Sequence, residues 1–317
     1  MNSLVFRRPA LLAAIALCGS LSLSACSSGG GEPSPDAAAP VTIAGVTVTS
    51  DAALHAALPE AIRKSGKVRV ATDIPYPPFE MYVSEGSKEM TGLDYDLGQA
   101  IGAKLGVRFE FQAQKFDGIV PALQAGKYDA AISAITDNKE REQVVDFVDY
   151  SVSGTGIMVA KGNPQKIVTL DDLCGRSVAV QTGTNQQKLL EKHQDKCREL
   201  GKGAVHLQTF PKDSDAQLAL RSGKVVADVL TKPAAGWTAK TADGGAAFEV
   251  VDDPAALGGY NASPNGIAVA KNLPQLTDAV QKALQQLIDD GSLAKIYAKY
   301  GAESIAVKQA TKNGAVD

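Results

Sequence analysis

Short apolar runs alternate with amphipathic segments through most of the chain. The runs rich in Val, Ile and Ala are predicted to be strands, at residues 68–72, 109–112, 130–135, 156–160, 177–181, 227–231 and 266–270. Apolar residues recur every three or four positions in 93–105 and 276–288, which predicts helices with one buried face, and Gly291 followed by a Ser292 cap predicts another helix at 293–300. Strands that alternate with helices are typical of βαβ units, so we expect an α/β fold with mainly parallel sheets.

A chain of 317 residues is long for one domain, so two lobes are expected. The formal net charge is -3, and loss of Arg7 and Arg8 with an amino-terminal leader would bring it to about -5. Nucleic-acid phosphates select a basic surface, and this composition therefore argues against a nucleic-acid partner.

The first 25 residues have the pattern of a secretory signal peptide. Arg7 and Arg8 precede an apolar run, and small residues follow it. The next stretch, Leu-Ser-Ala-Cys at residues 23–26, resembles the lipobox of bacterial lipoproteins, which predicts lipidation of Cys26 and anchoring to the outer face of the cell membrane. The alternative is an ordinary secretory peptide with a cysteine at its cleavage site.

The chain contains four cysteines; Cys18 would be removed with the leader, and Cys26 would become the lipid anchor. Cys174 and Cys197 remain in an oxidising compartment, so we expect a disulfide between them. The alternative is a pair of reduced, buried thiols.

Two segments lack the apolar residues that a core requires. Residues 26–58 are predicted to hold the lipid anchor and a flexible tether, because 27–42 consist mostly of Ser, Gly, Pro, Ala and acidic residues. Residues 308–317 are predicted to form a frayed tail.

The usual markers of catalysis and cofactor binding are missing from the sequence. His55, His193 and His206 lack metal-binding spacing, and neither a Walker loop nor a GxSxG motif occurs. We therefore expect no cofactor, no metal and no catalytic residues.

Six motifs carry a resemblance to a known family, at residues 71–80, 92–97, 116–123, 129–147, 178–184 and 265–269. The first reads Ala-Thr-Asp-Ile-Pro-Tyr-Pro-Pro-Phe-Glu, and the third reads Phe-Asp-Gly-Ile-Val-Pro-Ala-Leu. In content and order they resemble the polar amino-acid family of bacterial substrate-binding proteins, the family 3 solute-binding lipoproteins. The resemblance covers about residues 66–301.

The resemblance implies a two-lobe periplasmic-binding-protein fold of type II. Residues 59–155 and 265–307 would form lobe 1 and residues 156–264 lobe 2, with crossing strands near 151–156 and 262–267. A free amino acid would bind in the cleft, and hinge closure would bury it. The monomeric protein would then deliver it to an ABC permease with a separate ATPase subunit.

A free amino acid has a carboxylate and an ammonium group, and the family motifs supply partners for both. Arg141 matches the arginine that binds the carboxylate, although a solvent-facing helix arginine is the alternative. Ser133, Ala134 and Thr136 match positions that offer polar groups at a strand end. Asp73 matches an acidic position for the ammonium, against the alternative of a turn aspartate.

The remaining matches provide the cleft walls. Tyr76 and Phe116 match aromatic positions that sandwich the ligand, with core packing as the alternative. Gln181 and Thr184 precede a predicted helix at 186–194, where Thr184 also suits an N-cap. Thr231 stands where many family members carry an aspartate for the ammonium, so the ligand loses one expected partner.

The function that follows is extracytoplasmic capture of an amino acid for an ABC importer. A dehydratase-like enzyme on the same fold and a sensory ligand-binding domain are the alternatives. The preferred amino acid does not follow from these motifs.

Overall fold

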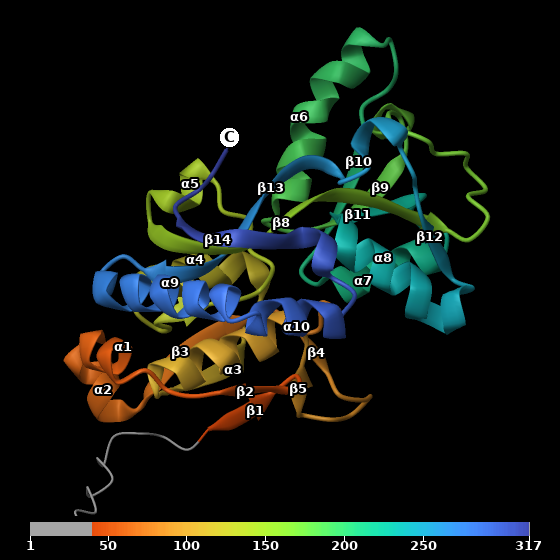
Figure 1. The fold of residues 1–317 in the computed structure, drawn as a ribbon. Coiled ribbons are helices and arrows are strands. Elements are labelled where there is room, and N and C mark those ends of the chain that lie inside the picture. The colour runs from red at the N-terminus through yellow and green to blue at the C-terminus, as the bar shows by residue number, and fades with distance from the viewer. Residues whose placement is uncertain (1–39, 317) are drawn as a thin grey trace, which may run out of the picture. The chain divides into compact units, whose positions relative to one another are not determined.

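The computed structural model describes residues 40–316, so the predicted signal peptide and Cys26 lie outside the described residues. Its main sheet has ten strands, eight of them in the order β10-β9-β11-β8-β13-β7-β3-β6, and Figure 1 shows β8 and β13 between the two halves. Two long antiparallel strands lie in the middle, β8 (Val145–Ala160) and β13 (Tyr260–Ala270). On either side of them stand three strands that pair in parallel. The predicted α/β class with two halves joined by crossing strands is confirmed.

The first half contains β3 (Lys67–Thr72), β6 (Arg108–Ala113) and β7 (Ala130–Ala131). Helix α3 (Leu93–Leu105) packs against β6 and against α9 (Pro274–Asp289), and the periodic apolar residues of both helices are buried except Ile288, which is half-buried. Gly92 begins α3 at a φ of 127°, where a Cβ atom would lie 2.3 Å from the Phe79 carbonyl oxygen. Glycine is therefore required at this turn.

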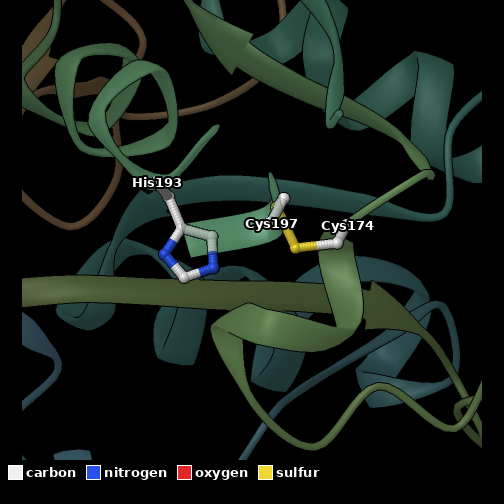
Figure 2. Close-up of side chains that lie close together, drawn as sticks. All are labelled: Cys174, His193 and Cys197. Atoms are coloured by element: carbon white, nitrogen blue, oxygen red, sulfur yellow. A yellow bond between two sulfur atoms is a disulfide. The ribbon is translucent and has the colours of Figure 1, made fainter. Parts of the chain in front are cut away.

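The second half contains β9 (Ser177–Gln181), β10 (His206–Phe210) and β11 (Ala227–Thr231). Its helices are α6 (Asn185–Glu199), α7 (Asp213–Arg221) and α8 (Lys232–Thr241), and the short strand β12 (Phe248–Val250) pairs with β8. Cys174 and Cys197 form the expected disulfide, which joins the segment before β9 to the end of α6 (Figure 2).

The remaining elements are short. They are α4 (Ile119–Gln124), α5 (Lys139–Glu142), α10 (Ser292–Lys299), the paired strands β4 (Met81–Tyr82) and β5 (Met90–Thr91), and the 3-10 helices η1 (Phe116–Gly118), η2 (Leu170–Leu173), η3 (Ala242–Gly245), η4 (Pro254–Ala256) and η5 (Glu303–Ile305). Within residues 40–316, no helix is long and apolar enough to cross a membrane.

The tether prediction is wrong for residues 41–58. Strands β1 (Val41–Ile43) and β2 (Val46–Val48) form a hairpin, and helices α1 (Ala52–Ala57) and α2 (Glu60–Ser65) follow it. The turn residues Ala44 and Gly45 both have positive φ, as two-residue hairpins require. Short alternating Val and Ile residues were enough to cover an edge of the first half's core, where Val46 and Val48 are buried.

The predicted frayed tail is also wrong. Residues from 306 onward form β14 (Ala306–Lys312), which pairs with β8 on the edge opposite β13. The segment is polar in sequence, but its backbone is satisfied by α9, because Gln285 accepts from the Ala310 amide and Gln281 donates to the Ala310 carbonyl. Backbone hydrogen bonding, rather than apolar content, orders this strand.

The structure also changes three predicted strands. The runs at 156–160 and 266–270 are parts of the longer strands β8 and β13. The run at 130–135 yields only the two residues of β7, because the chain turns sharply at Ala134, which has a φ of 46°.

Candidate functional site

A small cavity of about 20 Å³ lies where the carboxyl ends of strands from both halves meet. The first half contributes Asp73, Tyr76, Glu80, Phe116, Ser133, Ala134 and Thr136, and the second contributes Gln181, Thr184, Asn185, Gln186 and Thr231. Nine of the ten ligand-binding residues predicted from sequence are in this set, and Arg141 is the exception. The carboxyl ends of parallel strands are the usual position of ligand sites in such sheets.

Tyr76 links the two halves through its hydroxyl. This oxygen lies 2.9 Å from Thr231 Oγ1 and accepts from the Thr231 backbone amide at 3.0 Å. Burial raises the pKa of Tyr76 well above its ordinary value, so the phenol stays neutral. The two residues are 155 positions apart in the chain, and this contact exists only because the halves are close together.

Asp73 forms a second link across the cavity, because its carboxylate accepts a hydrogen bond from Gln181 Nε2. The aspartate is 7% exposed. Burial raises the pKa of Asp73, and the Gln181 hydrogen bond opposes this shift. The carboxylate predicted for the ligand ammonium therefore occupies the cavity wall and already has a partner from the other half.

Arg141 lies beside the cavity, at α5. Its Nη1 donates to the Thr136 carbonyl at 2.8 Å, and its Nη2 donates to the Gly183 carbonyl of the second half at 3.0 Å. The guanidinium carbon is 5.5 Å from the centre of the Phe116 ring. Burial lowers the pKa of Arg141 to about 10, so the side chain is still a cation at pH 7. Both of its described acceptors are backbone carbonyls, which carry no full negative charge.

Ser133 and Ala134 have partners within the first half. The Ser133 hydroxyl donates to Glu80 Oε1 at 2.7 Å and accepts from the Asp73 amide at 2.8 Å. The Ala134 amide donates to Asp94 Oδ2 at 2.7 Å, so this backbone donor is directed to a buried carboxyl. Ser133 therefore holds the strand end and Asp73 in a fixed relative position.

Thr184 is the N-cap of α6, because its hydroxyl accepts from the Gln187 amide at 3.2 Å. The cap interpretation of this residue is confirmed. Asn185 and Gln186 form the first turn of the helix and also line the cavity. The unpaired amides of a helix start favour an anion in this place.

Sequence reasoning missed the role of Glu80, Asn185 and Gln186. Glu80 is 1% exposed and lines the cavity, and its Oε2 has no hydrogen-bond partner. The signal was present in the first family motif, where an acid directly follows the buried Phe79. A charged residue inside an apolar stretch is informative because ionised side chains are rarely buried.

Two further acids lie close behind the second half's wall. Asp213 and Asp228 are 3% and 0% exposed. Burial raises the pKa of Asp213 to about 6, with repulsion from Asp73 adding to the shift. Burial, followed by repulsion from Asp213, raises the pKa of Asp228 well above its ordinary value. Both Asp228 oxygens and one Asp213 oxygen have no hydrogen-bond partner.

A larger opening of about 790 Å³ adjoins the cavity on the side of the crossing strands. Both volumes share the wall residues Thr136, Asn185, Gln186 and Thr231. A space of about 20 Å³ accommodates about one water molecule. An amino acid can enter only if the halves separate, and β8 and β13 are the strands that join them.

This arrangement, two α/β halves joined by crossing strands with a polar cleft between them, defines a two-lobe binding protein that closes on a small solute. The model of the bacterial extracellular solute-binding proteins, family 3, matches residues 68–303. The chain belongs to this family.

Two sequence relatives align with most of the chain. An arginine-binding protein of Corynebacterium glutamicum is 31% identical over 82% of this chain and 82% of its own. An L-cystine-binding protein of Escherichia coli K12 is 28% identical over 82% of this chain and 92% of its own.

Solved structures of amino-acid-binding proteins superpose on most of the chain. An ancestral arginine-binding protein bound to arginine superposes with a TM-score of 0.65 and 36% identity, covering 74% of this chain and 98% of its own. An ancestral amino-acid-binding protein described as a precursor of cyclohexadienyl dehydratase has a TM-score of 0.66 and 35% identity, covering 76% and 98%.

Proposed function

We propose that this protein captures a free amino acid between its lobes and delivers it to an ABC permease. The observation that carries the proposal is the cavity at the meeting point of the two halves, where polar groups of one half bond to those of the other. Family membership and the names of the relatives support it. In this proposal lobe 1 consists of residues 59–155 and 265–307, lobe 2 consists of 156–264, and a lipid on Cys26 holds the chain at the outer face of the membrane.

The cross-cleft contacts indicate how a ligand would replace them. Arg141 would exchange one backbone carbonyl for the ligand carboxylate, because a charge-assisted bidentate pair is stronger than a bond to a neutral acceptor. The first amides of α6 would add to the anion site. Asp73 would exchange its Gln181 partner for the ligand ammonium.

The acids around the cavity favour a cationic side chain on the ligand. Glu80 Oε2 is buried without a partner, Asp213 lies near enough to Asp73 to raise its own pKa, and no Lys or Arg is among the residues that line the cavity. Burial, followed by repulsion from Asp94, raises the pKa of Glu80 well above its ordinary value. A guanidinium or ammonium beside Glu80 would oppose that shift and pair with the ionised carboxylate, so it would be bound in preference to a neutral or acidic group. The faces of Tyr76 and Phe116 can also bind a cation.

The test is calorimetry on residues 27–317 with arginine, lysine, ornithine, glutamine, cystine and glutamate. We expect saturable binding of a cationic amino acid and none of glutamate. Glu80→Gln should weaken binding of the cationic ligand at least tenfold, whereas Glu85→Gln, an exposed acid on the following loop, should leave it unchanged. Preferential binding of glutamate would refute the cationic assignment.

Arg141 can be tested separately from the ligand side chain. Arg141→Ala should abolish binding, and Arg141→Lys, which keeps the charge but not the planar fork, should retain part of it. Unchanged affinity in Arg141→Ala would remove this residue from the site.

A separate incubation distinguishes a binding protein from an enzyme. Retention of an unaltered, stoichiometric ligand after long incubation would support a binding protein, and product formation would support an enzyme.

A further inference from the structure

A second cluster of metal-ligating side chains lies away from the cleft, around the disulfide. His193 and Cys197 are four residues apart on α6 and therefore share one face of the helix. Cys174 follows η2 and lies against that face (Figure 2). The ligand atoms of these three residues lie within 4.8 Å of one another. Among residues 40–316, it is the group of three or more His, Cys, Asp and Glu side chains whose ligand atoms are close enough to bind one ion.

The surroundings of His193 point to a ligand role. Its side chain is 11% exposed, and its Nε2 lies 3.0 Å from Asp171 Oδ1. Nevertheless, this buried nitrogen has no partner with hydrogen-bond geometry. A buried imidazole nitrogen without an aligned partner, next to two sulfur atoms and a carboxylate, is an arrangement that favours a divalent cation.

We propose that, when Cys174 and Cys197 are reduced, they bind one zinc ion together with His193. The disulfide and the metal are then alternative cross-links between the segment before β9 and α6. Two thiolates and one imidazole form three sides of a tetrahedral site, and Asp171 or water supplies the fourth. Bound zinc needs Zn–S distances of about 2.3 Å, which requires the sulfur atoms to move apart by side-chain rotation.

Conversion of the disulfide form to the zinc-bound form requires a dithiol reductant. The reductant transfers two electrons and two protons to the disulfide and becomes a disulfide itself, which leaves thiols on Cys174 and Cys197. Each thiol releases its proton when its sulfur binds Zn²⁺. Zinc therefore competes with reoxidation of the two cysteines.

The cross-link lies on the helix that begins at the ligand cavity. Thr184, Asn185 and Gln186 at the start of α6 line that cavity, and Cys197 lies in the helix's last turn. Either cross-link holds α6 against the second half of the molecule. A chain that has not yet formed its disulfide would have the helix fixed by zinc instead.

The experiment compares oxidised and dithiothreitol-reduced residues 27–317, freed of reductant under nitrogen. Reduced protein should bind one equivalent of Zn²⁺ and show a raised melting temperature, and Co²⁺ in its place should give thiolate-to-cobalt charge-transfer absorption. Oxidised protein should show neither. Equal metal binding by the two forms, or no binding by the reduced form, would overturn the proposal.

Substitutions of His193 test whether this residue binds the zinc ion. His193→Ala should weaken zinc binding at least tenfold, and His193→Asn serves if the alanine variant is unfolded by circular dichroism. His206→Ala, on the exposed strand β10, is the matched control and should bind zinc as the parent does. The same affinity in both His193 variants as in the parent would exclude His193 from the site. Amino-acid binding by the oxidised form is measured in parallel, so failure of the metal site and failure of the transport proposal are distinguishable.

Discussion

Asp137 and Asp149 form a buried carboxyl pair beside β14, and their titration should make the protein less stable as the pH rises. The two side chains are 1% and 3% exposed, and their hydrogen-bonding neighbours are each other and the Gly314 amide, so no cation balances the pair directly. Burial, followed by repulsion from Asp149, raises the pKa of Asp137 to about 8. Burial raises the pKa of Asp149 to about 6.

The sign follows from proton linkage. A carboxyl whose pKa is raised by folding binds its proton more tightly in the folded state, so the stability it contributes is complete below the unfolded pKa of 3.8. That stability is lost as the pH rises from there toward about 8. The shift of Asp137 corresponds to about 4 kcal/mol at pH 7. Screening by nearby water and charges reduces the expected effect to about 2 kcal/mol.

Asp149→Asn removes one carboxyl and lets the new amide donate to Asp137. The free energy of unfolding, from urea denaturation followed by circular dichroism, should exceed that of the parent by about 2 kcal/mol at pH 8. At pH 4.5 the two should agree within about 0.5 kcal/mol. Asp289→Asn, at an exposed aspartate, should follow the parent at both values. A difference between Asp149→Asn and the parent that is independent of pH would refute the reasoning.

Three further perturbations test separate parts of the structure. Tyr76→Phe removes the hydroxyl that bonds to Thr231, which should weaken the closed form and reduce ligand affinity by about tenfold in calorimetry; an unchanged affinity would mean that this bridge does not contribute to closure. Replacing Cys174 and Cys197 by Ser should lower the free energy of unfolding by about 3 kcal/mol in urea, and a loss below about 1 kcal/mol would contradict the chain-entropy estimate. Gly154→Ala should raise the rate of ligand release in stopped-flow fluorescence, because the added Cβ would lie 2.5 Å from the Gly259 backbone and strain the crossing segment. Identical release rates would show that the crossing strands accommodate the methyl group.

Local pattern was sufficient for the strands and helices that carry the site. The strand at 177–181, the strand at 227–231 and the helix at 93–105 were predicted with the boundaries that the structure has. Each is an uninterrupted apolar run or a regular helical stripe, so neighbouring residues in the chain determine it. Most site residues could be named because they lie in family motifs that follow strands; of the nine that line the cavity, eight lie in such a motif and Thr231 does not.

Local pattern failed where tertiary contacts supply the stabilisation. The hairpin at 41–48 alternates apolar and polar residues but is too short to be stable alone, and the strand at 306–312 is mostly polar; both are ordered by the half on which they pack. Apolar pattern alone did not extend the runs at 156–160 and 266–270, because their extensions are mixed in polarity and pair with each other; the crossing strands at 151–156 and 262–267 were predicted only from the family resemblance. Polar segments of this kind carry no periodic signal.

The sequence by itself determined the α/β class, the family and the identity of most residues that surround the cavity, because these depend on short-range pattern and motif. Only the tertiary structure decided that Tyr76 bonds to Thr231, that Asp73 bonds to Gln181, and that His193 lies beside the disulfide. Two of these contacts join residues more than 100 positions apart. Their distances are set by the packing of whole lobes and helices, which no local pattern contains.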